Sequence, residues 1–342
     1  MIVIYIIVYI VIGLISIYLV LSFMGFYLMN KGQLPFDYKA LEKDGGKYVE
    51  TENSRKVEYF VFGNLEPKAK VIICIHGSGP EAVSEINFNE KSCIELGLKG
   101  IAISLPGYGY TDMKPGRQVI DWPKEDLAAV LKKEEVDKFM IMGHSQGTVH
   151  AMAAAYYYPE RCEGFGLNSP LLPSKVSKEE GIVSAIGSDS LPNTATIQKF
   201  YMAWYFAVMD LMLVKMSPWL PLKAIKMANT TVSYKIMRDT LKRAVIRGSV
   251  GLTYETAHDV CYDWGFDPRK IKNRNICIWH ASDDKLCPPK IGKWLCNYYQ
   301  NKLGIKVNFR SDKLGYGHFT YKQGVFLETE QSMIKALQEG RN

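Results

Sequence analysis

Ser145 lies in the pentapeptide GHSQG, residues 143–147, which follows an apolar run and precedes an alanine-rich stretch. A strand, a G-x-S-x-G turn and a helix together form a nucleophile elbow, which raises a serine hydroxyl clear of a sheet. Gly143 and Gly147 suit this turn because a Cβ at either position would crowd the strand and the helix. The turn also puts Ser145 at a helix N-terminus, where backbone N–H groups stabilise a developing oxyanion. We therefore expect Ser145 to be a catalytic nucleophile.

A serine nucleophile needs a base, and the base needs an acid that orients it. In chains with this elbow the order is serine, acid, histidine. Asp284 follows an expected strand at 276–279, which puts it at the edge of the sheet where α/β sites form. His318 follows an expected strand at 306–310, in a glycine-rich loop that lets the imidazole reach the serine. We assign the acid to Asp284 and interpret its neighbour Asp283 as a loop carboxylate.

An oxyanion hole requires two backbone N–H donors. The residue after the nucleophile, Gln146, is expected to supply one of them. The second is expected from Ser78, in the segment HGSG that follows an apolar strand at 71–75. Glycine at such a position allows the backbone to approach a ligand closely, so His76 and Gly77 are expected to shape this loop.

The remaining reactive side chains indicate no cofactor. His144 lies inside the elbow and is expected to point away from the nucleophile, in a structural role. The seven cysteines show no C-x-x-C or other metal-binding spacing, and Cys74 and Cys277 fall in expected strands. Most of them are interpreted as small core residues in a reducing compartment. The glycines follow no phosphate-loop spacing, so we expect no metal, nucleotide or flavin.

Short apolar segments alternate with longer helical ones over most of the chain, which is typical of a parallel α/β sheet. Strands are expected at residues 57–62, 71–75, 100–105, 139–142, 163–167, 275–279 and 306–310, and helices at 121–133, 289–303 and 322–337 among others. The alternation predicts a mainly parallel, doubly wound sheet with helices on both faces.

The alternation stops between about residues 170 and 260, where aromatic residues and helix formers dominate. We interpret residues 171–260 as a helical cap inserted between two strands. Residues 211–250 carry eight Lys or Arg against one Asp, an excess equal to the whole chain's net charge of +7. Such a basic surface suits anionic lipid or an anionic substrate, and the alternative is a solvated helix face. No nucleic-acid-binding motif accompanies the charge, so no nucleic acid partner is expected.

Residues 2–30 contain no charged side chain and are rich in Ile, Val, Leu, Tyr and Phe. As a helix this segment would be roughly 40 Å long, enough to cross a bilayer with some tilt. It lacks the basic start and the small-residue cleavage site of a signal peptide, so we expect a permanent anchor. The lysines that follow, Lys31, Lys39, Lys43 and Lys47, favour a catalytic domain on the cytoplasmic side.

These motifs together resemble the α/β-hydrolase superfamily over about residues 55–338. The resemblance rests on HGSG at 76–79, LPGYG at 105–109, GHSQG at 143–147, PER at 159–161, WGF at 264–266, SDD at 282–284 and GH at 317–318. It is similar above all to capped esterase and lipase-like members, which implies an eight-stranded sheet and a cap after the strand at 163–167. Thr148 and Ala281 stand where many members have glycine. The serine nucleophile argues against the epoxide hydrolase and dehalogenase branches, which use aspartate.

The sequence thus predicts an anchor at 1–30, a connector at 31–55, an α/β-hydrolase core at 56–170 and 261–342, and a helical cap at 171–260. The predicted function is a membrane-anchored serine hydrolase that cleaves a carboxylic ester through an acyl-enzyme, with a thioester or an amide as the less favoured substrates. An apolar cap beside a membrane favours a lipid or acyl-chain substrate. Two alternatives remain: a non-catalytic subunit of a membrane complex, and an acyltransferase that uses the same triad. No protein partner is identified.

Overall fold

The structure is a computed structural model that describes residues 2–79, 81–182, 203–204, 207–208, 211, 240, 242–248, 251–252, 263–312, 317–318 and 333–340. Most of the predicted cap and most of the predicted helix at 322–337 lie outside the described residues.

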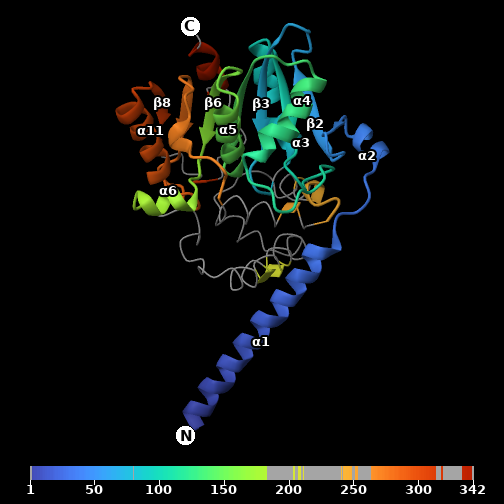
Figure 1. Ribbon diagram of the computed structural model, residues 1–342, viewed down its shortest axis with the longest axis vertical. Helices are drawn as coiled ribbons and strands as arrows, with labels where there is room; N and C mark the ends of the chain where they lie inside the picture. The colour runs from blue at the N-terminus through green and yellow to red at the C-terminus, as the bar shows by residue number, and fades with distance from the viewer. Residues whose placement is uncertain are drawn as a thin grey trace.

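An eight-stranded sheet forms the centre of the domain (Figure 1). Its strands are β1 (Lys47–Glu50), β2 (Lys56–Gly63), β3 (Lys70–Ile75), β4 (Leu98–Ile103), β5 (Phe139–His144), β6 (Cys162–Asn168), β7 (Ile276–Trp279) and β8 (Val307–Arg310). Their order across the sheet is β1-β2-β4-β3-β5-β6-β7-β8. Strand β2 is antiparallel to both of its neighbours, and every pair from β4 to β8 is parallel. The predicted fold class is confirmed.

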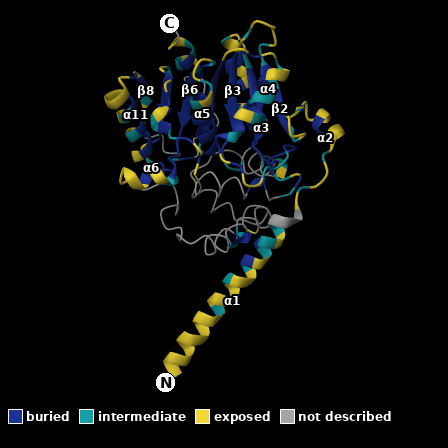
Figure 2. Ribbon diagram, in the orientation of Figure 1, coloured by how far each residue is buried: buried dark blue, intermediate teal, exposed yellow. Residues whose placement is uncertain are grey.

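The central strands are apolar and buried over most of their length because both faces of the sheet are covered, as Figure 2 shows. On one face, side chains such as Ile73 and Ile141 pack against α4 (Ala128–Lys133), α5 (Gln146–Tyr157) and α11 (Lys290–Leu303). On the other face, alternate side chains such as Cys74 and Met142 pack against α3 (Ala82–Glu95) and the helical residues 333–339.

Three shorter helical pieces complete the described part of the core. The predicted helix at 121–133 begins with a π-helical turn at Pro123–Leu127 and continues as α4. Helix α6 (Ser174–Glu179) follows β6, and a short 3₁₀ helix occupies Pro268–Lys270. The predicted connector contains helix α2 (Tyr38–Lys43) and strand β1, which the sequence analysis did not anticipate. Strand β1 is four residues long and largely exposed, so its apolar pattern is weak.

Helix α1 (Ile2–Lys31) extends away from the domain, with most of its apolar side chains exposed (Figures 1 and 2). Its segment Ile2–Leu28 has a mean hydropathy of 2.8, and this length and composition are sufficient to cross a membrane. The second half of the helix contacts two described residues of the predicted cap. The Tyr18 and Trp204 ring centroids are 6.1 Å apart, and a Cβ at Gly25 would lie 1.7 Å from the carbonyl oxygen of Ala203.

The chain that follows α1 is fastened to the domain by hydrogen bonds. The Gln33 side chain donates to the carbonyl of Thr111 at 3.0 Å and accepts from the backbone N–H of Met113 at 2.7 Å. The backbone N–H of Leu34 donates to the carbonyl of Arg247 at 2.9 Å. Helix α1 is therefore joined to the loop after β4 and to a described part of the predicted cap.

Candidate active site

Ser145 sits at the turn between β5 and α5, with φ of 52° and ψ of −118°. This left-handed backbone is costly for a residue with a side chain and persists because the surrounding structure holds it. A Cβ on Gly143 would lie 2.3 Å from the backbone of Gly147, and a Cβ on Gly147 would lie 2.2 Å from the carbonyl oxygen of Ile75. Both glycines are thus required by close backbone packing, and the Ser145 side chain remains partly exposed.

The Ser145 hydroxyl and two side chains from distant loops form a continuous hydrogen-bonded chain. His318 Nε2 lies 2.9 Å from Ser145 Oγ, and His318 Nδ1 lies 2.9 Å from Asp284 Oδ2. Because Asp284 Oδ2 accepts from Nδ1–H, the neutral imidazole has a free lone pair on Nε2, which is the atom that faces the serine. The three residues predicted as nucleophile, acid and base therefore meet at the carboxyl edge of the sheet.

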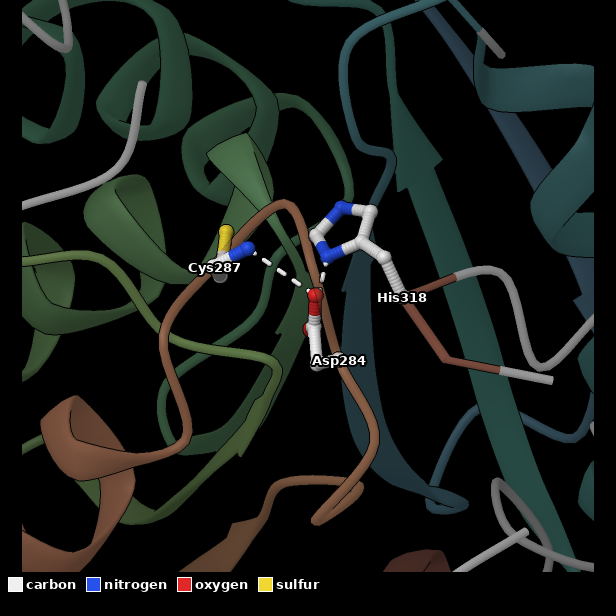
Figure 3. Close-up of side chains that lie close together, drawn as sticks. All are labelled: Asp284, Cys287 and His318. Carbon is white, nitrogen blue, oxygen red and sulfur yellow. Dashed lines mark hydrogen bonds and ion pairs between the residues drawn. The ribbon is translucent and has the colours of Figure 1, made fainter. Parts of the chain in front are cut away.

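Asp284 is held as a carboxylate by several donors (Figure 3). Its Oδ1 accepts the backbone N–H of Leu286 at 2.8 Å and that of Cys287 at 2.9 Å. The His280 ring lies close to the other carboxylate oxygen, since His280 Nε2 is 3.4 Å from Asp284 Oδ2. Burial raises the pKa of Asp284, but the hydrogen bonds from His280, His318 and Cys287 outweigh burial and hold that pKa well below its ordinary value.

The neighbouring carboxylate, Asp283, is half-buried and is not part of the hydrogen-bonded series that links Ser145, His318 and Asp284. Its Oδ1 has no hydrogen-bond partner in the described part of the chain. Of the two adjacent aspartates, the geometry therefore favours Asp284 as the acid.

His318 is buried, and its loop is held in place by a residue of the turn that carries Ser145. Gly317 adopts a left-handed φ of 56°, and His144 donates Nε2–H to the carbonyl of His318 at 3.0 Å. Burial lowers the pKa of His318, but the electrostatic interaction with Cys287 and the hydrogen bond to Asp284 outweigh it and raise that pKa above its ordinary value. The contact between His144 and His318, whose ring centroids lie 5.0 Å apart, could not be read from the sequence.

The loop after β3 lies against Ser145. A Cβ at Gly77 would lie 3.3 Å from the Ser145 Cβ, which places the next residue, Ser78, beside the site. His76 fixes this loop because its Nδ1–H donates to the Gly77 carbonyl at 2.8 Å and its Nε2 accepts the N–H of Leu105 at 3.0 Å. Burial lowers the pKa of His76 to about 3, so the ring stays neutral.

Three further contacts fix the elbow, and sequence reasoning did not identify them. Gln146 is buried at the start of α5, and the hydroxyl of Tyr108 donates to its Oε1 at 3.0 Å. The Thr148 hydroxyl donates to the Ser145 carbonyl at 2.6 Å and accepts the N–H of Leu171 at 3.3 Å. Thr148, which stands where many family members have glycine, therefore ties the elbow to the segment after β6.

Two basic residues of the predicted cap are paired with carboxylates and do not form a solvated or lipid-binding face. The Arg243 side chain, 12% exposed, contacts Glu58, lies 3.0 Å from Asp44 and lies 3.5 Å from Glu81. Arg247 is buried and pairs with Asp112 at 2.7 Å. The charges of these two residues are thus directed at carboxylates of the domain. The other basic residues between 211 and 239 lie outside the described residues.

The chain matches a family model described as alpha/beta hydrolase fold over residues 70–324. Among curated proteins it is 25% identical over 181 residues to a 2-hydroxy-6-oxononadienedioate/2-hydroxy-6-oxononatrienedioate hydrolase from Pseudomonas putida, covering 50% of this chain and 62% of that protein. The aligned part thus spans less than two thirds of the relative.

Solved structures share the fold at low sequence identity. An esterase from Exiguobacterium antarcticum matches with a TM-score of 0.61 and 14% identity, covering 87% of this chain and all of that one. The enol-lactonase from Burkholderia xenovorans LB400 matches with a TM-score of 0.56 and 14% identity, covering 84% of this chain and all of that one. At these identities the likeness shows the fold alone.

Proposed function

The chain belongs to the α/β-hydrolase family, and from that premise we propose that it is a serine hydrolase that cleaves a carboxylic ester. One observation carries the proposal: Ser145, His318 and Asp284 form an unbroken hydrogen-bonded chain whose two links are each 2.9 Å long. A serine that merely occupied a tight turn would need neither link. The name of the curated relative, a hydrolase, supports hydrolysis as the class of reaction.

The proposed reaction follows from which atoms face each other. His318 Nε2 accepts the proton of Ser145 Oγ as that oxygen attacks the ester carbonyl, and Asp284 holds the resulting imidazolium. The backbone N–H groups of Ser78 and Gln146 are proposed to stabilise the oxyanion. The imidazolium then protonates the leaving alcohol, and the acyl group remains on Ser145. Water, deprotonated by His318, releases the acid and restores the serine.

The proposed substrate is the ester of a lipid or another acyl chain. What supports it is the place of α1, which leaves the domain at the end where α6 follows β6 (Figure 1). This is the end at which the parallel strands finish and at which Ser145 lies. Contacts of Gly25 and Tyr18 with residues 203–204 join α1 to the predicted cap. A bilayer crossed by α1 would thus lie on the same side of the domain as Ser145.

We further propose that residues 2–30 are a single-pass anchor and that the catalytic domain is cytoplasmic. The side chains of Lys39, Lys43 and Lys47, which follow α1, are exposed, and lysines close to a membrane span favour the cytoplasmic side. Protease protection of a tagged C-terminus in sealed vesicles tests this orientation.

The function is tested with matched p-nitrophenyl esters of a short and a long acyl chain, presented to the detergent-solubilised chain in mixed micelles. We expect hydrolysis by the wild type and a loss of at least roughly 10³-fold in Ser145→Ala. The long ester is expected to react faster. If the short, soluble ester were hydrolysed faster than the long one, the lipid assignment would be overturned, and the proposal of a serine hydrolase would still stand. Equal rates in wild type and Ser145→Ala would overturn the hydrolase and favour the scaffold alternative. Transfer of the acyl group to added alcohol in preference to water would favour the acyltransferase.

A further inference from the structure

Cys287 lies beside the triad although the proposed reaction does not use its thiol. One ligand atom from each of Asp284, Cys287 and His318 lies within 4.8 Å of the other two. All three residues are buried, with Cys287 3% exposed and the other two 6% exposed. A carboxylate oxygen, a thiol sulfur and an imidazole nitrogen are therefore gathered in one water-poor place (Figure 3).

We propose that this cluster, Asp284, Cys287 and His318, binds Zn²⁺ and that bound zinc switches the triad off. Zinc takes cysteine, histidine and carboxylate ligands at about 2.3, 2.0 and 2.1 Å, in a tetrahedron whose ligand atoms are roughly 3.3–3.6 Å apart. His318 Nδ1 and Asp284 Oδ2 are 2.9 Å apart, which is slightly less than the separation of two zinc ligands. The largest separation between ligand atoms of the cluster is at most 4.8 Å, which is slightly more than that separation. Small side-chain movements would therefore complete the geometry.

The charges of the cluster balance those of the ion. A buried dication is costly unless anionic ligands neutralise it. The Asp284 carboxylate supplies one negative charge, and the Cys287 thiol supplies the second when its proton leaves to solvent. His318 binds as the neutral ring. The complex has no net charge, and the sulfur ligand favours zinc over the hard cations Mg²⁺ and Ca²⁺.

A fourth ligand is available from the same loop. His280 is 1% exposed, and its Nε2 lies 3.4 Å from Asp284 Oδ2 and 2.9 Å from the carbonyl of Cys287. Its Nδ1 has no hydrogen-bond partner in the described part of the chain. A shift of the ring proton from Nε2 to this unpartnered Nδ1 would free Nε2 for the metal.

Zinc at this place would block the reaction through the tautomer of His318. The metal occupies Nδ1, so the ring proton moves to Nε2, the atom that faces Ser145 Oγ at 2.9 Å. A protonated Nε2 cannot accept the serine proton, and the nucleophile is no longer activated. This inhibitory effect rests on the proposed function, whereas the binding of zinc does not.

The first experiment measures zinc binding by competition with a fluorescent chelator, using the full chain in detergent. We expect one Zn²⁺ per chain in the wild type and in Ser145→Ala, which lacks the nucleophile but keeps every ligand. Cys287→Ala should bind at least about tenfold more weakly. Cys296→Ala is the matched control, since Cys296 is also buried but lies on α11 outside the cluster. Equal affinity in wild type and Cys287→Ala would overturn the site.

The second experiment measures the rate of fluorophosphonate labelling with and without Zn²⁺. The wild type and Cys296→Ala should be slowed at least about tenfold and recover when EDTA is added, while Cys287→Ala should be insensitive. Zinc that binds without slowing the labelling would overturn the switch. A metal-free wild type that does not label would count against the proposed function, and the chelator titration would still decide the site. Cys287→Ser, checked by its melting curve, replaces Cys287→Ala if that variant does not fold.

Discussion

His144 donates its Nε2–H to the backbone carbonyl of His318 at 3.0 Å, and the two imidazole rings lie 5.0 Å apart. The residue that precedes Ser145 therefore holds the loop that carries His318. Burial, together with the neighbouring His318, lowers the pKa of His144 to about 3. The ring stays neutral through the physiological range, which keeps this single tautomer as a permanent donor.

Replacing His144 by Ala should lower kcat/KM by about tenfold while the chain stays folded. The loss of one hydrogen bond costs about 1–1.5 kcal/mol, and 1.4 kcal/mol corresponds to a factor of ten. His144→Gln, whose side-chain amide reaches in the same direction, should recover most of the rate. A fully active His144→Ala would show that the His318 loop does not depend on this contact.

Replacing Asp284 by Asn should lower kcat by roughly 10³–10⁴-fold with little change in stability. The amide can donate to His318 Nδ1, which favours the tautomer with a proton on Nε2 and removes the base. Asp283→Asn is the matched control and should stay within about twofold of the wild type, because Asp283 does not contact the ring. The comparison is made by ester hydrolysis, and the reverse ranking of the two variants would move the acid to Asp283.

Activity should fall as the pH is lowered, and the midpoint of this fall should lie above 6.5, the ordinary pKa of histidine. Only the unprotonated ring accepts the serine proton, and Cys287 and Asp284 raise the pKa of His318 above the ordinary 6.5. The fluorophosphonate labelling rate of metal-free protein should therefore rise with pH through a midpoint above 6.5. Cys287→Ala removes one of the raising interactions, so its midpoint should lie at lower pH. A wild-type midpoint at or below 6.5 would contradict this electrostatic account.

Arg243 should be essential for stability. Its side chain contacts the buried carboxylate of Glu58 and lies 3.5 Å from Glu81, whose pKa burial raises to about 8. Removing the arginine leaves the buried charge of Glu58 uncompensated. Arg243→Ala is expected to cost about 3–5 kcal/mol, which lowers Tm by roughly 10 °C for a chain of this size. Lys242→Ala, at the exposed neighbouring position, should leave Tm within about 1 °C of the wild type. If the two variants had the same Tm, Arg243 would not be essential for the stability of the domain.

Much of the fold, and the meeting of Ser145, Asp284 and His318, could be predicted because the signals are local. The central strands such as β3 and β5 are short, mostly apolar runs, and parallel strands bring their carboxyl ends together at one edge. Residues that follow different strands, Ser145, Asp284 and His318, are therefore close in space although 173 positions separate the first from the last. The strained turn at Ser145 was also readable, since glycine flanks the serine.

The contacts that support the triad could not be predicted, because they join residues with no shared pattern. His144 meets the backbone of His318, and His280 meets Asp284, only once the loops are folded. The sequence shows the positive charge of Arg243 but gives no sign that Glu58 and Glu81 face it. The sequence assigns no role to Cys287, since nothing in its spacing places it beside a histidine 31 residues away.

The central claim is that Ser145 is an activated nucleophile, and active-site labelling tests it most directly. Wild type and Ser145→Ala, each metal-free, are solubilised in detergent, shown to be folded by their melting curves, and treated with a fluorophosphonate probe. The account predicts covalent labelling of the wild type at Ser145, located by mass spectrometry, and none in the variant. A folded wild type that does not label, or a variant that labels equally, would contradict it.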